Sequence, residues 1–279
     1  MNESFLIRHR YWLLLAASVF LYVSFLGTRD FWYPDEPDIG EVAQAMYLSG
    51  DWVSPRRNGV IWVDYWPMLY WAGCVCCAVL GGVSEFGLRL ASALGGIALL
   101  LWTCRVASRM YGPRAGFWAG LMLLTSSSFV YAAVSYRPDV LFALAIAGAF
   151  FAYAQGSGDT PRWWPRVLAF ALLGAAVLTK GPLGLLLPGL VLTLWHGSRR
   201  EWQLLCQLAP LTLVALAVSA PWAFACANAM TAEGLVGEKG FWGEVYQQNF
   251  GRYDAGDRGH GKPFYYYAVV LVLDLGPWV

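Results

Sequence analysis

Residues 11–42 read YWLLLAASVFLYVSFLGTRDFWYPDEPDIGEV and join a long apolar run to a cluster of acidic residues. Apolar runs near the length that crosses a bilayer recur along the chain, between groups of arginines. The chain is 58% hydrophobic and 13% charged, whereas soluble domains carry about 25% charged residues. This pattern predicts an all-α polytopic membrane protein built as a multi-helix transmembrane bundle. Because no small-residue cleavage site follows the first run, we expect it to stay as an uncleaved first span.

The composition and the absence of certain motifs argue against several classes of function. The net charge of +1 implies no bulk attraction to nucleic acid. The six cysteines lie in apolar runs without metal-type spacing, so neither a disulfide nor a zinc site is predicted. The sequence requires no cofactor and predicts no metal site, and a divalent cation stays open. No glycine-rich nucleotide loop, HExxH or Gly-x-Ser-x-Gly motif occurs, which argues against nucleotide-driven pumps and hydrolases of those kinds.

The arginines predict an orientation, because basic residues near the ends of spans favour the cytoplasm. Arg8 and Arg10 place the N-terminus inside. Later arginine clusters lie between apolar runs at 105–114, 162–166 and 199–200. All of these lie inside only if the apolar piece 68–82 does not cross the membrane. We therefore expect it in a large external loop whose helices lie at the membrane surface; the alternative, that 68–82 spans, stays open.

This orientation divides the chain into spans and loops. We expect a single transmembrane domain over residues 1–279. It comprises a first span (11–27), an external loop with interfacial helices (28–87), about six spans (88–222), a second external loop (223–263) and the start of a further span (264–279). The six expected spans are 88–106, 115–134, 140–154, 167–178, 183–195 and 204–222.

Charges of both signs gather on the external side in this orientation. The chain has three lysines, Lys180, Lys239 and Lys262, and all lie on or near that side. The preference of basic residues for the cytoplasmic side does not explain lysines on the external side. Six carboxylates lie there too: Asp35, Glu36, Asp38, Glu41, Asp64 and Asp139. The pattern predicts an active site at the outer membrane surface.

Asp35 and Glu36 lie directly before the start of a predicted helix over 37–48. Capping and the helix dipole account for one or two acids at such a position. Four acids exceed that need, so we predict a functional role for Asp35 and Glu36. Asp38 and Glu41 are expected to be solvated or paired with arginine.

Two further motifs carry candidate residues. In SYRPDV, Arg137 can be an anchor at a span end, but Asp139 opens an apolar run, where a carboxylate is costly unless it is partnered. In LTKGP, Gly181 and Pro182 break the helix after Lys180, whose ammonium suits a phosphate. A simple loop lysine is the alternative for Lys180.

The stretch RGHGKPFYYY sets His260 and Lys262 directly before a group of tyrosines that begins at Tyr265. The tyrosines alone are typical of an aromatic belt at a membrane surface. With a histidine and a lysine upstream, we predict a phosphate or sugar contact.

Seven motifs occur in one order: YPDEPDIGEVAQAM, VDYWPMLYW, EFGLRLASAL, RPD, LTKGP, APW and HGKPFYYY. Together they resemble the membrane-embedded GT-C glycosyltransferases, in particular the bacterial 4-amino-4-deoxy-L-arabinose lipid A transferases and their protein O-mannosyltransferase relatives. The resemblance covers essentially the whole chain. It implies transfer of a sugar from a polyprenyl-phosphate carrier to a lipid, glycan or protein acceptor, at the outer face of the bacterial inner membrane.

The resemblance also implies roles for individual residues. Asp35, with Glu36 beside it, would take the acceptor's proton in an inverting displacement. The candidates for stabilising the leaving phosphate are Arg137, Lys180, His260 and Lys262. Asp64 matches the acidic position of the family's (D/E)KPP element, which implies a contact to sugar or to a metal.

The chain departs from the family pattern in three places. Tyr65 and Trp66 stand where the (D/E)KPP element has a lysine and a proline, and Asp38 stands where the family has an arginine. The chain stops at LGPWV, inside an apolar run, whereas family members continue, so we expect a truncated or partial chain. The sugar and the acceptor stay open.

Two alternative functions also stay open. A transporter or flippase of a lipid-linked substrate would show charges at mid-membrane and repeated halves, and the charges here gather at one interface. The other alternative is a truncated, non-catalytic remnant.

Overall fold

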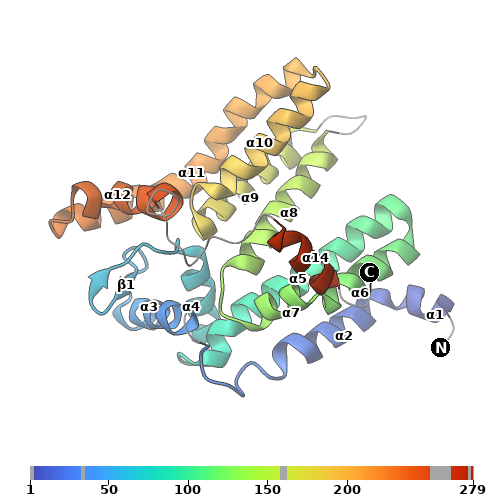
Figure 1. The fold of residues 1–279 in the computed structure, drawn as a ribbon, viewed down its shortest axis with the longest axis horizontal. Coiled ribbons are helices and arrows are strands. Elements are labelled where there is room, and N and C mark those ends of the chain that lie inside the picture. The colour runs from blue at the N-terminus through green and yellow to red at the C-terminus, as the bar shows by residue number, and fades with distance from the viewer. Residues whose placement is uncertain (1–2, 33–34, 158–161, 252–264, 276–277, 279) are drawn as a thin grey trace. The chain divides into compact units, whose positions relative to one another are not determined.

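The structure, a computed structural model, describes residues 3–32, 35–157, 162–251, 265–275 and 278 (Figure 1). Helices dominate it. The chain divides into two compact units. The first unit contains Met1–Glu41, Ala72–Val140 and Asp257–Val279, and the second contains Val42–Trp71 and Leu141–Gly256.

Five helices form the main body of the first unit, and the last four of them contribute most of its buried core residues. They are α1 (Glu3–Arg8), α2 (Arg10–Val23), α5 (Glu85–Tyr111), α6 (Pro113–Thr125) and α7 (Ser127–Val134). Helix α2 contacts α5, α6 and α7, and Leu14, Tyr22 and Leu100 are buried among them. The Tyr22 hydroxyl donates a hydrogen bond to the Leu124 carbonyl oxygen at 3.2 Å, which satisfies a polar group inside this apolar core. Helix α14 (Tyr266–Leu275) contacts α7.

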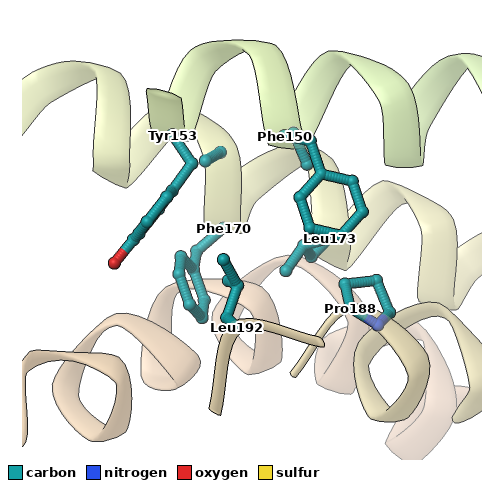
Figure 2. A pocket seen from close by; sticks show the side chains of 8 residues that line it. Phe150, Tyr153, Phe170, Leu173, Pro188 and Leu192 are labelled. Carbon is teal, nitrogen blue, oxygen red and sulfur yellow. The ribbon is translucent and has the colours of Figure 1, made fainter. Parts of the chain in front are cut away.

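The second unit contains four apolar helices whose side chains pack together (Figure 1). They are α8 (Asp139–Gly156), α9 (Trp163–Lys180), α10 (Leu183–Ser198) and α11 (Trp202–Ala232). Figure 2 shows side chains of α8, α9 and α10, among them Tyr153, Phe170 and Leu192, around a small apolar pocket. The short elements η1 (Gly237–Lys239), α12 (Phe241–Tyr246) and η2 (Gln247–Gly251) follow α11.

The predicted loop region 28–87 contains two helices and a hairpin. The helices are α3 (Asp35–Ser49) and α4 (Met68–Leu80), and the strands are β1 (Arg56–Arg57) and β2 (Val60–Ile61). Asn58 and Gly59 connect the strands with φ angles of 50° and 80°, the positive values that favour Asn-Gly in a two-residue hairpin turn. Helix α4 has 13 residues, fewer than the roughly 20 that a span needs.

The predicted spans coincide with helices. Within the described residues, α5, α8 and α11 are long and apolar enough to cross a membrane, and α6 with α7 would form a fourth span if the pair is counted as one. That pair is bent by 66° between Thr125 and Ser127. Helix α11 continues to Ala232, beyond the expected end of the span at 222. The side of the membrane on which each loop lies stays a prediction.

The helix break after Lys180 is confirmed. Helix α9 ends at Lys180, Gly181 has a φ of 66°, and α10 begins at Leu183. A positive φ favours glycine, and proline fits best at or before the first turn of the next helix, so Gly181 and Pro182 together explain the turn.

Candidate active site

Four of the predicted site residues come together in the first unit. Asp35 and Glu36 begin α3, and Arg137 and Asp139 lie where α7 leads into α8. The Arg137 Nη1 atom forms an ion pair with Asp35 Oδ2, and its Nε atom lies 3.0 Å from Asp139 Oδ2. The side chains of Asp35, Arg137 and Asp139 are 34%, 28% and 36% exposed. A cation thus holds two carboxylates in a position that solvent or a substrate can reach.

The Arg137 guanidinium stays charged in this arrangement. Burial alone would lower its pKa, but the hydrogen bond to Asp139 and the charges of Asp139 and Asp35 raise the pKa above its ordinary value. Among the described residues, Arg137 is the only hydrogen-bond partner of the Asp35 side chain. The Asp35 Oδ1 atom is therefore available to accept a further hydrogen bond.

Glu36 differs from its neighbour because its side chain is buried, with the residue 2% exposed. Its carboxylate accepts two hydrogen bonds of 3.0 Å from Arg89 Nε and Nη2, and one of 2.8 Å from Arg29 Nη1. The backbone N–H groups of Trp32 and Tyr136 each donate another at 2.7 Å. Five hydrogen bonds saturate this carboxylate, so the geometry favours a structural role for Glu36 over the predicted catalytic one.

Arg89 is the buried partner that fixes the loop before α3. It is fully buried, and besides Glu36 it donates hydrogen bonds of 2.8–2.9 Å to the carbonyl oxygens of Leu26, Arg29 and Asp30. Its guanidinium carbon lies 4.9 Å from the centroid of the Phe31 ring. All five donors of the guanidinium are used, which holds the chain that leads into Asp35 against α5.

Glu36 also ties α3 to the turn that carries Arg137. The Tyr136 N–H donates a hydrogen bond to Glu36, and the ring of Tyr136 is buried against α4, where a Cβ on Gly73 would clash with the Tyr136 hydroxyl oxygen. Only a glycine leaves room there for the tyrosine. Arg29 adds hydrogen bonds of 3.3 Å to the Val134 carbonyl and the Ser135 hydroxyl oxygen. The buried network therefore positions both halves of the exposed Asp35–Arg137–Asp139 cluster.

The network predicts acid sensitivity of the first unit. Burial alone would raise the pKa of Glu36, but the hydrogen bonds from Arg89, Trp32, Tyr136 and Arg29 outweigh it and lower the pKa to about 2. As the pH falls, the unfolded chain protonates this carboxyl first. We expect stability on the order of 3 kcal/mol to be fully present above about pH 5 and lost toward about pH 2. Thermal unfolding in detergent between these pH values measures it.

The matched control for this measurement is Glu36→Gln, which has no carboxyl to protonate. The stability difference between the native chain and this variant should shrink as the pH falls. A difference that is the same at both ends of the pH range would contradict the low pKa of Glu36.

Asp64 and Lys180 belong to the second unit. Asp64 lies between β2 and α4, and Lys180 ends α9 with its Nζ atom 5.4 Å from the centroid of the Phe142 ring. A Cβ on Gly181 would lie 2.8 Å from Trp66 Nε1, and Trp66 packs in turn against Trp222 with ring centroids 5.1 Å apart. Trp66 thus packs directly against the turn after Lys180.

The other predicted residues lie near the C-terminal end. Tyr265 is exposed and directly precedes α14. His260 and Lys262 lie outside the described residues. In the described part of the chain, no three His, Cys, Asp or Glu side chains gather as a metal site would require. The contact predicted for Tyr265 and the metal contact considered for Asp64 stay predictions.

Sequence reasoning missed Arg89 and Arg29 as site residues. Arg89 stands at the start of the apolar run 88–106, where a charged side chain needs a partner. The acids of the preceding loop are the nearest candidates along the chain. That signal could have indicated a buried pair, although it does not tell which acid is the partner.

Comparisons with known proteins agree with this fold. Residues 64–224 match the sequence profile of the family described as dolichyl-phosphate-mannose-protein mannosyltransferase. The chain is 31% identical to undecaprenyl phosphate-alpha-4-amino-4-deoxy-L-arabinose arabinosyl transferase 2 of Pseudomonas fluorescens (strain Pf0-1), over 96% of this chain and 48% of the relative. The corresponding transferase of Edwardsiella ictaluri (strain 93-146) is 30% identical over the same shares of the two chains.

A solved structure shows the same fold. The crystal structure of ArnT from Cupriavidus metallidurans bound to undecaprenyl phosphate superimposes with a TM-score of 0.81 at 27% identity, over 96% of this chain and 48% of that one. This confirms the predicted all-α polytopic membrane fold. The chain spans about half the length of the curated relatives it matches. Since the family profile covers more than half of its residues, the chain belongs to the family of dolichyl-phosphate-mannose-protein mannosyltransferases.

Proposed function

We propose that this chain belongs to an integral-membrane glycosyltransferase that moves a sugar from a polyprenyl-phosphate carrier to a lipid, glycan or protein acceptor. The observation that carries the proposal is the Asp35 carboxylate, partly exposed and held by Arg137. The donor class is taken from the relatives, whose names specify undecaprenyl phosphate-linked 4-amino-4-deoxy-L-arabinose. Family membership and the Asp35 geometry together support sugar transfer over transport.

The proposed reaction is an inverting single displacement. The acceptor hydroxyl oxygen attacks the anomeric carbon, and Asp35 takes the hydroxyl proton. The bond from the anomeric carbon to the carrier's phosphate oxygen breaks, and the phosphate leaves with the bonding electron pair. One ion pair to Arg137 leaves the second oxygen of Asp35 to receive the proton.

Arg137 acts in this proposal as a positioning residue. Two carboxylates already share its guanidinium, which reduces the positive charge that it can offer a phosphate. We assign the charge of the leaving phosphate to Lys180, together with His260 and Lys262. Asp64 and Tyr265 are proposed to contact the substrate.

The proposed location is the bacterial inner membrane, with the N-terminus in the cytoplasm and Asp35 on the external face. The positions of the arginines support this orientation. Arg8 and Arg10 precede or begin the first apolar helix, and the later clusters lie at the junctions of α5 with α6, of α8 with α9 and of α10 with α11. With α6 and α7 counted as one span, all of these clusters fall on the cytoplasmic side.

The function is tested with the full chain in liposomes and a panel of polyprenyl-phosphate-linked sugars that includes 4-amino-4-deoxy-L-arabinose. We expect free polyprenyl phosphate to form only when an acceptor is present, and the product to have the opposite anomeric configuration by NMR. Retained configuration would contradict the single displacement. Movement of the intact lipid-linked sugar across the membrane without cleavage would instead establish a transporter.

A further inference from the structure

One end of the helix group in the second unit carries a surface of exposed arginines and tryptophans. Arg162 directly precedes α9, which begins with Trp163 and Trp164. Trp195, Arg199, Arg200 and Trp202 lie where α10 turns into α11, and we call these seven residues the Arg–Trp surface. Figure 1 shows both segments at the same end of α8–α11. Each of the four tryptophans is more than half exposed, and the three arginines are exposed as well.

A buried polar network holds this end of the helices together. The Tyr153 hydroxyl of α8 lies 2.9 Å from His196 Nε2 of α10, and His196 Nδ1 lies 2.6 Å from Glu201 Oε2. Arg166 of α9 donates a hydrogen bond of 2.6 Å to the side-chain oxygen of Gln207 of α11. The seven side chains are therefore presented by a fixed framework.

The surface carries more positive than negative charge, since three arginines share it with one partly exposed acid, Glu201. Glu201 is the only acidic residue in the segments 162–166 and 195–207, and its carboxylate is turned onto His196. Arg199 lies over the Trp195 ring, 4.0 Å from its centroid. Beside Arg200 an open hollow of about 450 Å³ is lined by Arg200, Glu201, Trp202, Gln203 and Leu204.

We propose that the Arg–Trp surface binds the phosphate headgroups of anionic phospholipids, with one headgroup in the hollow beside Arg200. The apolar helices α8 and α11 each have the length and composition of a membrane span and end here, so the surface lies at headgroup level. Tryptophan favours that level, and the planar guanidinium of arginine binds phosphate through two parallel hydrogen bonds. The surface includes none of the candidate active-site residues.

The test uses the full chain purified in a neutral detergent, with binding of phosphatidylglycerol and phosphatidylcholine of equal acyl chains measured by native mass spectrometry. We expect the native chain to retain phosphatidylglycerol in preference to phosphatidylcholine. The hydrogen bonds that these guanidinium groups donate to a headgroup phosphate are charge-assisted, and losing one such contact weakens binding roughly tenfold. The triple variant Arg162→Gln/Arg199→Gln/Arg200→Gln should therefore bind phosphatidylglycerol at least about tenfold more weakly.

The matched control is Arg105→Gln/Arg109→Gln/Arg114→Gln, which removes three exposed arginines at the end of α5 and the start of α6. It should bind nearly as the native chain does. Equal retention by the native chain and the surface variant, or equal losses in both variants, would overturn the proposal. If the surface variant fails to fold by circular dichroism, Arg200→Gln alone should still weaken binding roughly tenfold, and an unchanged affinity would be the contrary result.

Discussion

Asp35→Asn is expected to lower the rate of sugar transfer by about 10²–10⁴-fold, the usual contribution of a positioned general base. Asparagine keeps the shape of the side chain and an oxygen that can accept the hydrogen bond from Arg137, but it cannot take up the acceptor's proton. Because Asp35 is about a third exposed and contributes nothing to the buried network of Glu36, the variant should fold normally. The rate is measured as release of polyprenyl phosphate in membranes that contain equal amounts of each protein.

Asp38→Asn is the matched control for this change. It removes one negative charge from the first turn of the same helix, three residues from Asp35. Transfer by the control should stay close to the native rate. If both variants lose activity equally, the effect comes from the charge of the helix start and not from a base at Asp35.

Glu36→Gln is expected to destabilise the first unit by about 3–5 kcal/mol, the usual cost of removing one partner from a buried ion pair. The substitution leaves Arg89 without its buried counter-ion and places an amide N–H₂ group among donors from Arg89, Arg29 and the backbone. The unfolding temperature in detergent, followed by circular dichroism, measures the loss.

Glu85→Gln provides the comparison for Glu36→Gln. Glu85 lies 3.7 Å from Arg89 Nη1, but its side chain is 38% exposed, so its loss should cost less than about 1 kcal/mol. A Glu36→Gln variant with native stability and no transfer activity would contradict the structural role of Glu36 and restore its predicted catalytic role.

Much of the helix pattern could be predicted from the sequence because hydropathy and local breakers act over short distances. Gly181 and Pro182 locate the break between α9 and α10 through their own backbone preferences. The end of α11 was harder to predict, because the expected end at 222 came from the length that a membrane span needs. Span length does not limit a helix, and α11 continues for ten more residues to Ala232.

The candidate site was predictable in its residue types but not in its pairings. The scarcity of carboxylates in so apolar a chain indicated Asp35, Glu36 and Asp139 as site residues, but two of the ion pairs join residues that are far apart in sequence. Arg89 is 53 residues from Glu36, and Arg137 is 102 residues from Asp35. Successive residues of a helix point about 100° apart, so adjacent acids can have opposite environments. Only the tertiary contacts of Glu36 with Arg89, Arg29 and the N–H of Tyr136 explain why Glu36 is buried while Asp35 is partly exposed.

A double-mutant cycle on Asp35 and Arg137 tests most directly whether a carboxylate positioned by this arginine performs the transfer. Arg137→Gln alone is expected to slow transfer by about 10²-fold through misplacement of the base. The double variant Asp35→Asn/Arg137→Gln should be no slower than Asp35→Asn, because the arginine acts through a group that is already lost. Losses that multiply in the double variant, or a native rate for Asp35→Asn, would contradict this account.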